Sequence, residues 1–238
     1  MQILILGASS QVGVSLARAF APGNTLWLLG RDRSKLDQAV QAALSAGATR
    51  CSALTIDLGE IRDASTALAG LGDGPLDLII DAASASSSLR DSEVPAGAMQ
   101  RLVLADVASR VPLMEALLAR QPQPPAIIVI STVLARLRSP DRLVYSALKQ
   151  LLESYYQRLA AERPRLRLLV VTVGTVIDPL RPSEKPVRLA AAVLQAFSEG
   201  RTSLFFGGIG KIYLALFYLQ PLVFFAVTRL QRALRGRR

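Results

Sequence analysis

The chain has 238 residues with no histidine and one cysteine, which excludes a Ser-His-Asp triad, a histidine-ligated metal site and an internal disulfide. Lysine and arginine outnumber aspartate and glutamate by 28 to 18, for a net charge of +10, and 51% of the residues are hydrophobic. So basic a chain suits an anionic partner such as a phosphorylated ligand or an acidic lipid, and its length suits one α/β domain.

Short aliphatic runs alternate with amphipathic segments along most of the chain. The runs predict strands over residues 2–6, 25–29, 52–56, 77–81, 126–131, 167–172 and 203–206. The amphipathic segments predict helices over residues 12–20, 34–46, 60–70, 97–119, 142–162 and 185–199. Aliphatic strands that alternate with helices indicate a parallel sheet covered on both faces. We therefore predict an α/β fold with a doubly wound, Rossmann-type parallel sheet, in one domain over residues 1–207.

Residues 208–238 differ from this domain in composition. An apolar run over 212–228, interrupted by Gln220 and Pro221, precedes five arginines within the last ten residues. The run is shorter than the about 20 apolar residues that span a bilayer, so we predict a helix at a membrane surface with a basic anchor over 212–238. The alternative is a helix buried in a homo-oligomer interface.

Two further observations bear on partners and location. The basic residues outside the tail are scattered and form no recognised nucleic-acid motif, so no nucleic-acid partner is predicted. The apolar start over 1–6 is too short for a signal peptide and runs into a glycine turn. We expect a cytoplasmic protein that binds peripherally to the inner face of the membrane.

A glycine turn follows the first strand. Its residues, from the end of the strand to the predicted helix, are Gly7, Ala8, Ser9, Ser10, Gln11, Val12 and Gly13. Gly7 allows a tight turn, and Gly13 lets the helix pack closely on the strand. The free N–H groups at the helix start suit a pyrophosphate, whereas a plain strand-to-helix turn is the alternative.

The second strand ends in Gly30, and Arg31 and Asp32 follow. In a dinucleotide-binding fold, an acidic residue at the end of this strand binds the adenosine ribose, whereas an arginine just beyond it suits a 2′-phosphate. Arg31 therefore favours NADP(H), and Asp32 keeps NAD(H) open. A solvated surface arginine is the remaining reading.

Tyr145 and Lys149 are spaced i, i+4 at the start of a predicted helix, which places both on one helical face. A nearby ammonium stabilises a phenolate, so Lys149 is expected to lower the pKa of Tyr145 toward the range of an acid-base catalyst. Thr132 ends the preceding strand, and its hydroxyl can donate a hydrogen bond to a substrate carbonyl.

These elements, in this order, resemble a compact short-chain dehydrogenase/reductase over residues 1 to about 206. The resemblance implies that Tyr145 donates the proton to the carbonyl, that Lys149 holds the nicotinamide ribose and tunes Tyr145, and that Thr132 replaces the usual serine. It also implies cofactor contacts for Asp57 and Leu58 beside the adenine, for Ala82 and Ala83 after the fourth strand, and for Gly174 and Val176 beside the nicotinamide.

The chain departs from the family pattern at several positions. Gln11 replaces the middle glycine of the turn, and Asp81 begins the segment that usually reads Asn-Asn-Ala-Gly. Asp106 replaces the asparagine that supports a proton-relay water, and Val173 replaces a proline. Ser131 beside Thr132 leaves a one-residue ambiguity about the hydroxyl. The charge of Asp106 is expected to alter the relay.

The segment after Gly174 leads quickly into the next helix and implies an open site. An open site beside an apolar, basic tail suits a hydrophobic or lipid-linked carbonyl substrate. We therefore predict an NADP(H)-dependent oxidoreductase that reduces a carbonyl or oxidises the matching alcohol. The alternative is an NADP(H)-binding scaffold or sensor that has lost catalysis. The departures from the family pattern at Gln11, Asp81 and Asp106 favour this alternative.

Overall fold

The chain folds around one parallel sheet. The structure is a computed structural model that describes residues 1–61, 63–72, 74–84, 93–136, 142–174 and 184–207. The strands are β1 (Gln2–Leu6), β2 (Thr25–Gly30), β3 (Arg50–Thr55), β4 (Leu78–Asp81), β5 (Ala126–Thr132), β6 (Leu168–Val173) and β7 (Ser203–Phe206). Their order is β3-β2-β1-β4-β5-β6-β7, with every neighbouring pair parallel. The predicted doubly wound fold is confirmed.

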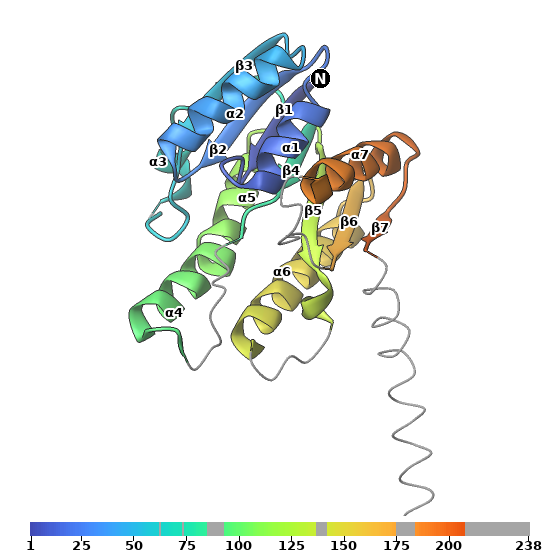
Figure 1. Ribbon diagram of the computed structural model, residues 1–238. Coiled ribbons are helices and arrows are strands. Elements are labelled where there is room, and N and C mark those ends of the chain that lie inside the picture. The colour runs from blue at the N-terminus through green and yellow to red at the C-terminus, as the bar shows by residue number, and fades with distance from the viewer. Residues whose placement is uncertain (62, 73, 85–92, 137–141, 175–183, 208–238) are drawn as a thin grey trace, which may run out of the picture.

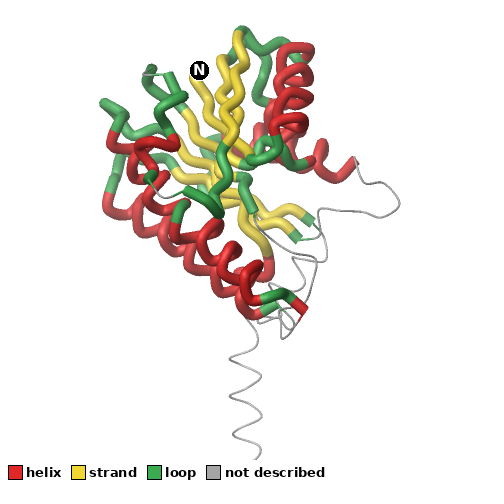
Figure 2. Tube along the Cα trace, turned by 90° about the vertical axis from the view of Figure 1, so that its left-hand side faces the viewer, coloured by secondary structure: helices red, strands yellow, loops and turns green. Residues whose placement is uncertain are grey.

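Helices cover both faces of this sheet, as Figures 1 and 2 show. One face carries α1 (Gln11–Ala19), α2 (Arg33–Ser45) and α7 (Glu184–Ser198). The other carries α3 (Ala64–Ala67), α5 (Arg110–Ala119) and α6 (Leu143–Glu162), and α4 (Ala96–Val103) precedes α5. Successive strand residues point to opposite faces, so Ile3 and Ile5 pack under the first set and Leu4 and Leu6 under the second.

β1 and β4 are neighbours in the middle of the sheet, and the strand order reverses between them. The loops at their carboxyl ends diverge to opposite faces, so a crevice opens between them. Gly7 after β1 and Ala83 after β4 lie at this crevice. The fold therefore brings the predicted glycine turn next to the segment after the fourth strand.

Two predicted helices differ from the structure. The predicted helix over 60–70 is wrong in extent, because only Ala64–Ala67 is helical among the described residues there. The helix predicted over 97–119 is continuous in direction but contains a π-helical turn, η2 (Leu104–Ala108), between α4 and α5. Pro112 explains this turn: its missing N–H and its ring preclude the ordinary bond to Ala108. The N–H of Ser109 bonds instead to the carbonyl of Leu104, five residues earlier, at 2.9 Å.

Candidate active site

The glycine turn forms the start of α1 and touches the neighbouring loop. Gly7 has a φ of +80°, and a Cβ there would lie 2.6 Å from the Cα of Ala83. Ser10 caps α1, because its Oγ accepts a hydrogen bond from the N–H of Gly13 at 3.0 Å. Any side chain at position 7 would therefore push the turn away from β4 and shift the helix start with it.

A cavity of about 300 Å³ runs along the carboxyl ends of β1, β2 and β4. Its lining includes these predicted cofactor residues: Gly7, Ser9, Ser10, Arg31, Asp57, Leu58, Ala82 and Ala83. Gln11 is exposed on α1, and Gly13 is buried in the packing between turn and helix. Gln11, although it was predicted as a cofactor residue, is not among the lining residues.

The end of β2 carries the groups that distinguish two cofactors. Arg31 is exposed at the cavity. Asp32 is the N-cap of α2: its carboxylate accepts from the N–H of Lys35 at 3.1 Å and pairs with the Lys35 ammonium at 3.4 Å. The backbone N–H of Lys35 is the first cause of a lowered pKa at Asp32. At Gly30, a Cβ would lie 2.8 Å from Ser9 Oγ, so a side chain there has little room.

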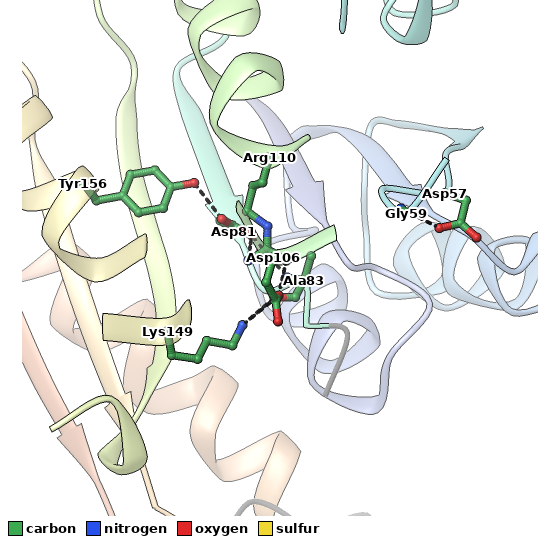
Figure 3. A network of polar contacts seen from close by, with 8 residues as sticks. All are labelled: Asp57, Gly59, Asp81, Ala83, Asp106, Arg110, Lys149 and Tyr156. Carbon is green, nitrogen blue, oxygen red and sulfur yellow. Dashed lines mark hydrogen bonds and ion pairs between the residues drawn. The ribbon is translucent and has the colours of Figure 1, made fainter. Parts of the chain in front are cut away.

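Asp57 and Leu58 follow β3 at the far wall of the cavity. The Asp57 carboxylate accepts a hydrogen bond from the N–H of Gly59 at 2.9 Å, which holds the turn in place (Figure 3). Leu58 is half-buried against the core on the α5 side of the sheet. Both residues therefore line the cavity, and their contact with an adenine stays a prediction.

Tyr145 and Lys149 lie on the same side of α6, with the Lys149 Nζ 5.7 Å from the centroid of the Tyr145 ring. Lys149 is 3% exposed and donates to the carbonyl of Ala83 at 3.3 Å. Ala83 lines the cavity, so this hydrogen bond connects the ammonium to the cavity wall, although Lys149 and Tyr145 are not among the lining residues. The expectation that the i, i+4 spacing places both side chains on one helical face is therefore confirmed.

The protonation of this pair differs from the sequence expectation. Burial raises the pKa of Tyr145, with Asp106 acting in the same direction, while a hydrogen bond with Ser84 and the charges of Arg142 and Arg110 oppose it. The expected lowering of this pKa is therefore wrong for the chain by itself. Burial also lowers the pKa of Lys149, against the attraction of Asp106. The ammonium is paired with that carboxylate rather than with a phenolate.

Two hydroxyls end β5, and the structure separates their roles. Ser131 is buried, and its Oγ donates to the Glu153 carboxylate of α6 at 2.7 Å. Arg136 pairs with the same carboxylate at 2.6 Å. Thr132 is half-buried and caps the short turn η3 (Val133–Ala135), accepting from the N–H of Leu134 at 3.3 Å. The hydroxyl proton of Thr132 is free of this cap, which favours Thr132 over Ser131 as a donor to a ligand.

Next to the cavity lies a buried charge cluster, which we define as Asp81, Asp106, Arg110 and Lys149 (Figure 3), and its member Arg110 also lines the cavity. Arg110 contacts Asp106 at 3.0 Å and Asp81 at 3.7 Å, and Lys149 contacts Asp106 at 3.3 Å. All four residues are at most 3% exposed. The Tyr156 hydroxyl donates to Asp81 at 2.6 Å, so α6 reaches the cluster twice.

Sequence reasoning missed Arg110 and Tyr156. Arg110 follows Asp106 by four residues, a spacing that signals an ion pair on one helix. Burial opposes the charge of Arg110, but Asp81 and Asp106 outweigh it and hold its pKa above the usual value. No comparable signal marked Tyr156, because its partner Asp81 lies 75 residues away.

Other predicted positions lie at the edge of what the structure describes. Gly174 follows β6 and bonds through its N–H to the carbonyl of Phe206 at 3.1 Å. Val176 and the tail over 208–238 lie outside the described residues. Among the helices that are described, none is long and apolar enough to cross a membrane.

Comparison with known proteins agrees with this architecture. Residues 1–179 match the family model of the short chain dehydrogenases. The chain is 28% identical to dehydrogenase/reductase SDR family member 7B of Danio rerio, over 94% of this chain and 83% of that protein. It is 27% identical to an uncharacterized oxidoreductase of Mycobacterium tuberculosis, over 84% and 85% of the two chains.

Solved structures share the fold at lower identity. A short-chain dehydrogenase from Sphingobium yanoikuyae in complex with NADPH aligns with a TM-score of 0.76 at 22% identity, over 93% of this chain and 94% of that one. The bulky-bulky ketone specific alcohol dehydrogenase from Comamonas testosteroni aligns with the same score and identity, over 93% of each chain. With the family model matching most of its length, the chain belongs to the short-chain dehydrogenase/reductase family and has its oxidoreductase fold.

Proposed function

We propose that the chain is an NADP(H)-dependent oxidoreductase that reduces a carbonyl group, or oxidises the matching alcohol, on a hydrophobic substrate, free or linked to a lipid. The observation that carries the proposal is the placement of Tyr145 and Lys149. They share one side of α6, and the Lys149 ammonium donates to the carbonyl of Ala83, which lines the cavity. A phenol and an ammonium that reach the wall of the cavity through Ala83 suit carbonyl reduction.

The described residues fit a nicotinamide dinucleotide. The turn from Gly7 to Gly13 presents the capped start of α1, which suits the pyrophosphate, and the wall formed by Asp57 and Leu58 suits the adenine. Lys149 would hold the nicotinamide ribose. When bound, the cofactor supplies the hydride for the carbonyl carbon.

The preference for NADP(H) is supported by three features at the end of β2. Arg31 is exposed at the cavity, where a guanidinium suits a 2′-phosphate. Asp32 is engaged as the cap of α2 and as partner of Lys35, so it is poorly placed to bind a ribose. Gly30 leaves no acidic side chain at the strand end itself. The NADPH complex of the Sphingobium neighbour is in line with this preference.

In the proposed reduction, Tyr145 donates its hydroxyl proton to the carbonyl oxygen as that oxygen gains charge. The raised pKa keeps the phenol protonated at neutral pH, as a donor requires. Thr132 donates a second hydrogen bond to the same oxygen. The alcohol product then leaves a phenolate at Tyr145, which solvent reprotonates.

Tyr145→Phe tests the proposal, with Tyr155→Phe as the matched control. Tyr155 lies on the same helix, but its hydroxyl donates to Glu115 at 2.7 Å, away from the cavity. We expect Tyr145→Phe to abolish NADPH-dependent reduction of a panel of hydrophobic ketones and to leave NADPH binding by fluorescence nearly unchanged. Turnover that survives in Tyr145→Phe would refute the assigned role.

A second candidate function is a cofactor-binding scaffold or sensor without turnover. The ion pair of Lys149 with Asp106 and the raised pKa of Tyr145 favour it, because both oppose formation of a phenolate. This candidate predicts NADPH binding with no reduction of any carbonyl in the panel. Binding with measurable turnover would eliminate it.

For the tail over 208–238 we propose a lipid surface as the partner and a peripheral position at the inner face of the membrane. The support comes from its apolar run and its five terminal arginines. Truncation after Gly208 should abolish binding to anionic liposomes. A truncated chain that becomes monomeric while lipid binding is unchanged would assign the tail to an oligomer interface instead.

A further inference from the structure

The buried charge cluster contains two carboxylates and two cations, so the loss of any one member leaves an unbalanced charge. Asp81 comes from the end of β4, Asp106 from the π-helical turn η2, Arg110 from α5 and Lys149 from α6. Buried ion pairs rarely repay the loss of solvation, and an apolar core of the same volume is often as stable. Stability alone therefore gives no reason for this cluster at the end of the cavity.

Arg110 is the only member that contacts both acids. Its guanidinium lies 3.0 Å from the Asp106 carboxylate and 3.7 Å from that of Asp81. The Lys149 ammonium contacts only Asp106 among the cluster's acids at ion-pair distance, at 3.3 Å. Asp106 is thus shared by two cations: Arg110, which lines the cavity, and Lys149, which donates to the carbonyl of the lining residue Ala83.

Resting on the proposed function, we propose that Arg110 is a positioning residue of the active site: by binding Asp81 and Asp106 together, it balances their charge and sets how firmly Asp106 holds the ammonium of Lys149. Without Arg110, two carboxylates would act on one ammonium. Lys149 would then be drawn toward Asp106 and away from a ribose. Without Asp106, Arg110 would repel Lys149 with no acid between them.

The groups that face Lys149 from each neighbouring element define the expected titration. They are Asp81 of β4, Asp106 of η2, Arg110 of α5 and, on α6 itself, Tyr145. Tyr156 bonds to Asp81, and Arg142 acts on Tyr145. Asp106 and Asp81 raise the pKa of Lys149, whereas Arg110 lowers it. Removing Arg110 and removing Asp106 must therefore move this pKa in opposite directions.

The test is a pH titration of the Lys149 side chain by NMR with 13Cε-labelled lysine in the full chain, which contains only four lysines. We expect the titration midpoint to rise in Arg110→Gln and to fall in Asp106→Asn. The midpoint should return near the wild-type value in the double variant Arg110→Gln/Asp106→Asn, whose cluster is again neutral. Arg110→Lys keeps the charge, so its midpoint should also lie near the wild-type value. Arg120→Gln is the matched control: Arg120 ends α5, bonds to carbonyls of Leu68 and Leu71, and should move nothing.

A purely structural Arg110 would lower the unfolding temperature without this ordering of midpoints. Equal midpoints in wild type, Asp106→Asn and Arg110→Gln, or shifts of the same sign, would overturn the proposal. If Arg110→Gln does not fold, the double variant decides: its midpoint must lie above that of Asp106→Asn, since the two differ only in Arg110. The titration needs neither cofactor nor substrate, so its failure is distinct from failure of the proposed reduction.

A second readout connects the cluster to the reaction. In the carbonyl reductase assay, the pH profile of kcat/KM should move in opposite directions in Arg110→Gln and Asp106→Asn, with the double variant between them. Loss of NADPH binding in all three variants alike would contradict a positioning role.

Discussion

The contribution of the Tyr156–Asp81 hydrogen bond to stability can be compared with that of the Tyr155–Glu115 hydrogen bond, which has nearly the same length. Tyr156 is fully buried and donates to the Asp81 carboxylate at 2.6 Å. Tyr155 donates to the Glu115 carboxylate at 2.7 Å, but that carboxylate is 42% exposed. The rings of the two tyrosines pack edge to face with centroids 5.2 Å apart, a contact that phenylalanine preserves.

Tyr156→Phe is expected to destabilise the fold by about 2 kcal/mol, because a hydrogen bond to a charged group contributes roughly 1.5–3 kcal/mol and the buried carboxylate cannot turn to water. In a domain of this size, that loss lowers the unfolding temperature by about 4–8 °C. Tyr155→Phe should lose less than about 1 kcal/mol, since water can replace the hydroxyl at Glu115.

Urea unfolding followed by circular dichroism measures both variants, with the midpoint expected to fall and the slope to stay constant. Comparable losses in the two variants would refute the reasoning, because burial of the acceptor is the difference on which it depends. A changed slope in Tyr156→Phe would mean that the native or unfolded state itself had changed.

Three further predictions concern the cavity and the core. Arg31→Gln should weaken NADPH binding at least about tenfold and leave NADH binding unchanged, by fluorescence titration; equal losses for both cofactors would contradict a phosphate contact. Thr132→Val should lower kcat about 10²-fold, whereas Ser131→Ala should leave kcat intact and destabilise the fold by about 1–2 kcal/mol; the reverse pattern would make Ser131 the donor. Burial raises the pKa of Cys51 from 9.0 to about 11, so the unfolded chain loses this proton first. The contribution of this thiol to stability should therefore be full below pH 9 and, discounted for its partial exposure, decline by about 1 kcal/mol toward pH 11, a decline that Cys51→Ala would remove in urea titrations at the two pH values.

The sequence predicted the sheet well because its central strands are buried on both faces. Such strands must be aliphatic at consecutive positions, and the run from Leu78 to Ile80 has no exposed residue. The glycine turn was equally readable, since Gly7 needs a positive φ and close contact with Ala83. In both cases the structural requirement restricts the residue type at the position itself, so the sequence alone indicates it.

The predicted helices that differ show where local pattern is insufficient. Apolar spacing over 97–119 is helical throughout, so periodicity gave one continuous helix. Pro112 was visible, but its effect depends on which carbonyl it displaces, and the chain absorbs it in a π-helical turn. That turn carries Asp106, so an error in helix geometry is also an error in where a site residue lies.

The protonation of Tyr145 could not be inferred from spacing. The i, i+4 relation to Lys149 correctly placed both side chains on one helical face, but their protonation depends on burial and on every charge around them. The Lys149 ammonium pairs with Asp106 and donates to the carbonyl of Ala83. Its charge is therefore balanced by Asp106 and does not lower the pKa of Tyr145 as the spacing suggested. The neighbours of a catalytic pair decide its acidity as much as the pair itself.

Asp81 and Asp106 each looked like a separate departure from the family pattern, and each suggested impaired chemistry. The structure joins them through Arg110, so they form one electrostatic unit rather than two independent losses. A carboxylate that replaces a buried amide needs a cation within reach, since an unpaired buried charge is strongly destabilising. The i, i+4 spacing from Asp106 therefore predicts that Arg110 is this cation, and the structure confirms it. Its second partner, Asp81, lies on β4, which only the fold brings near α5.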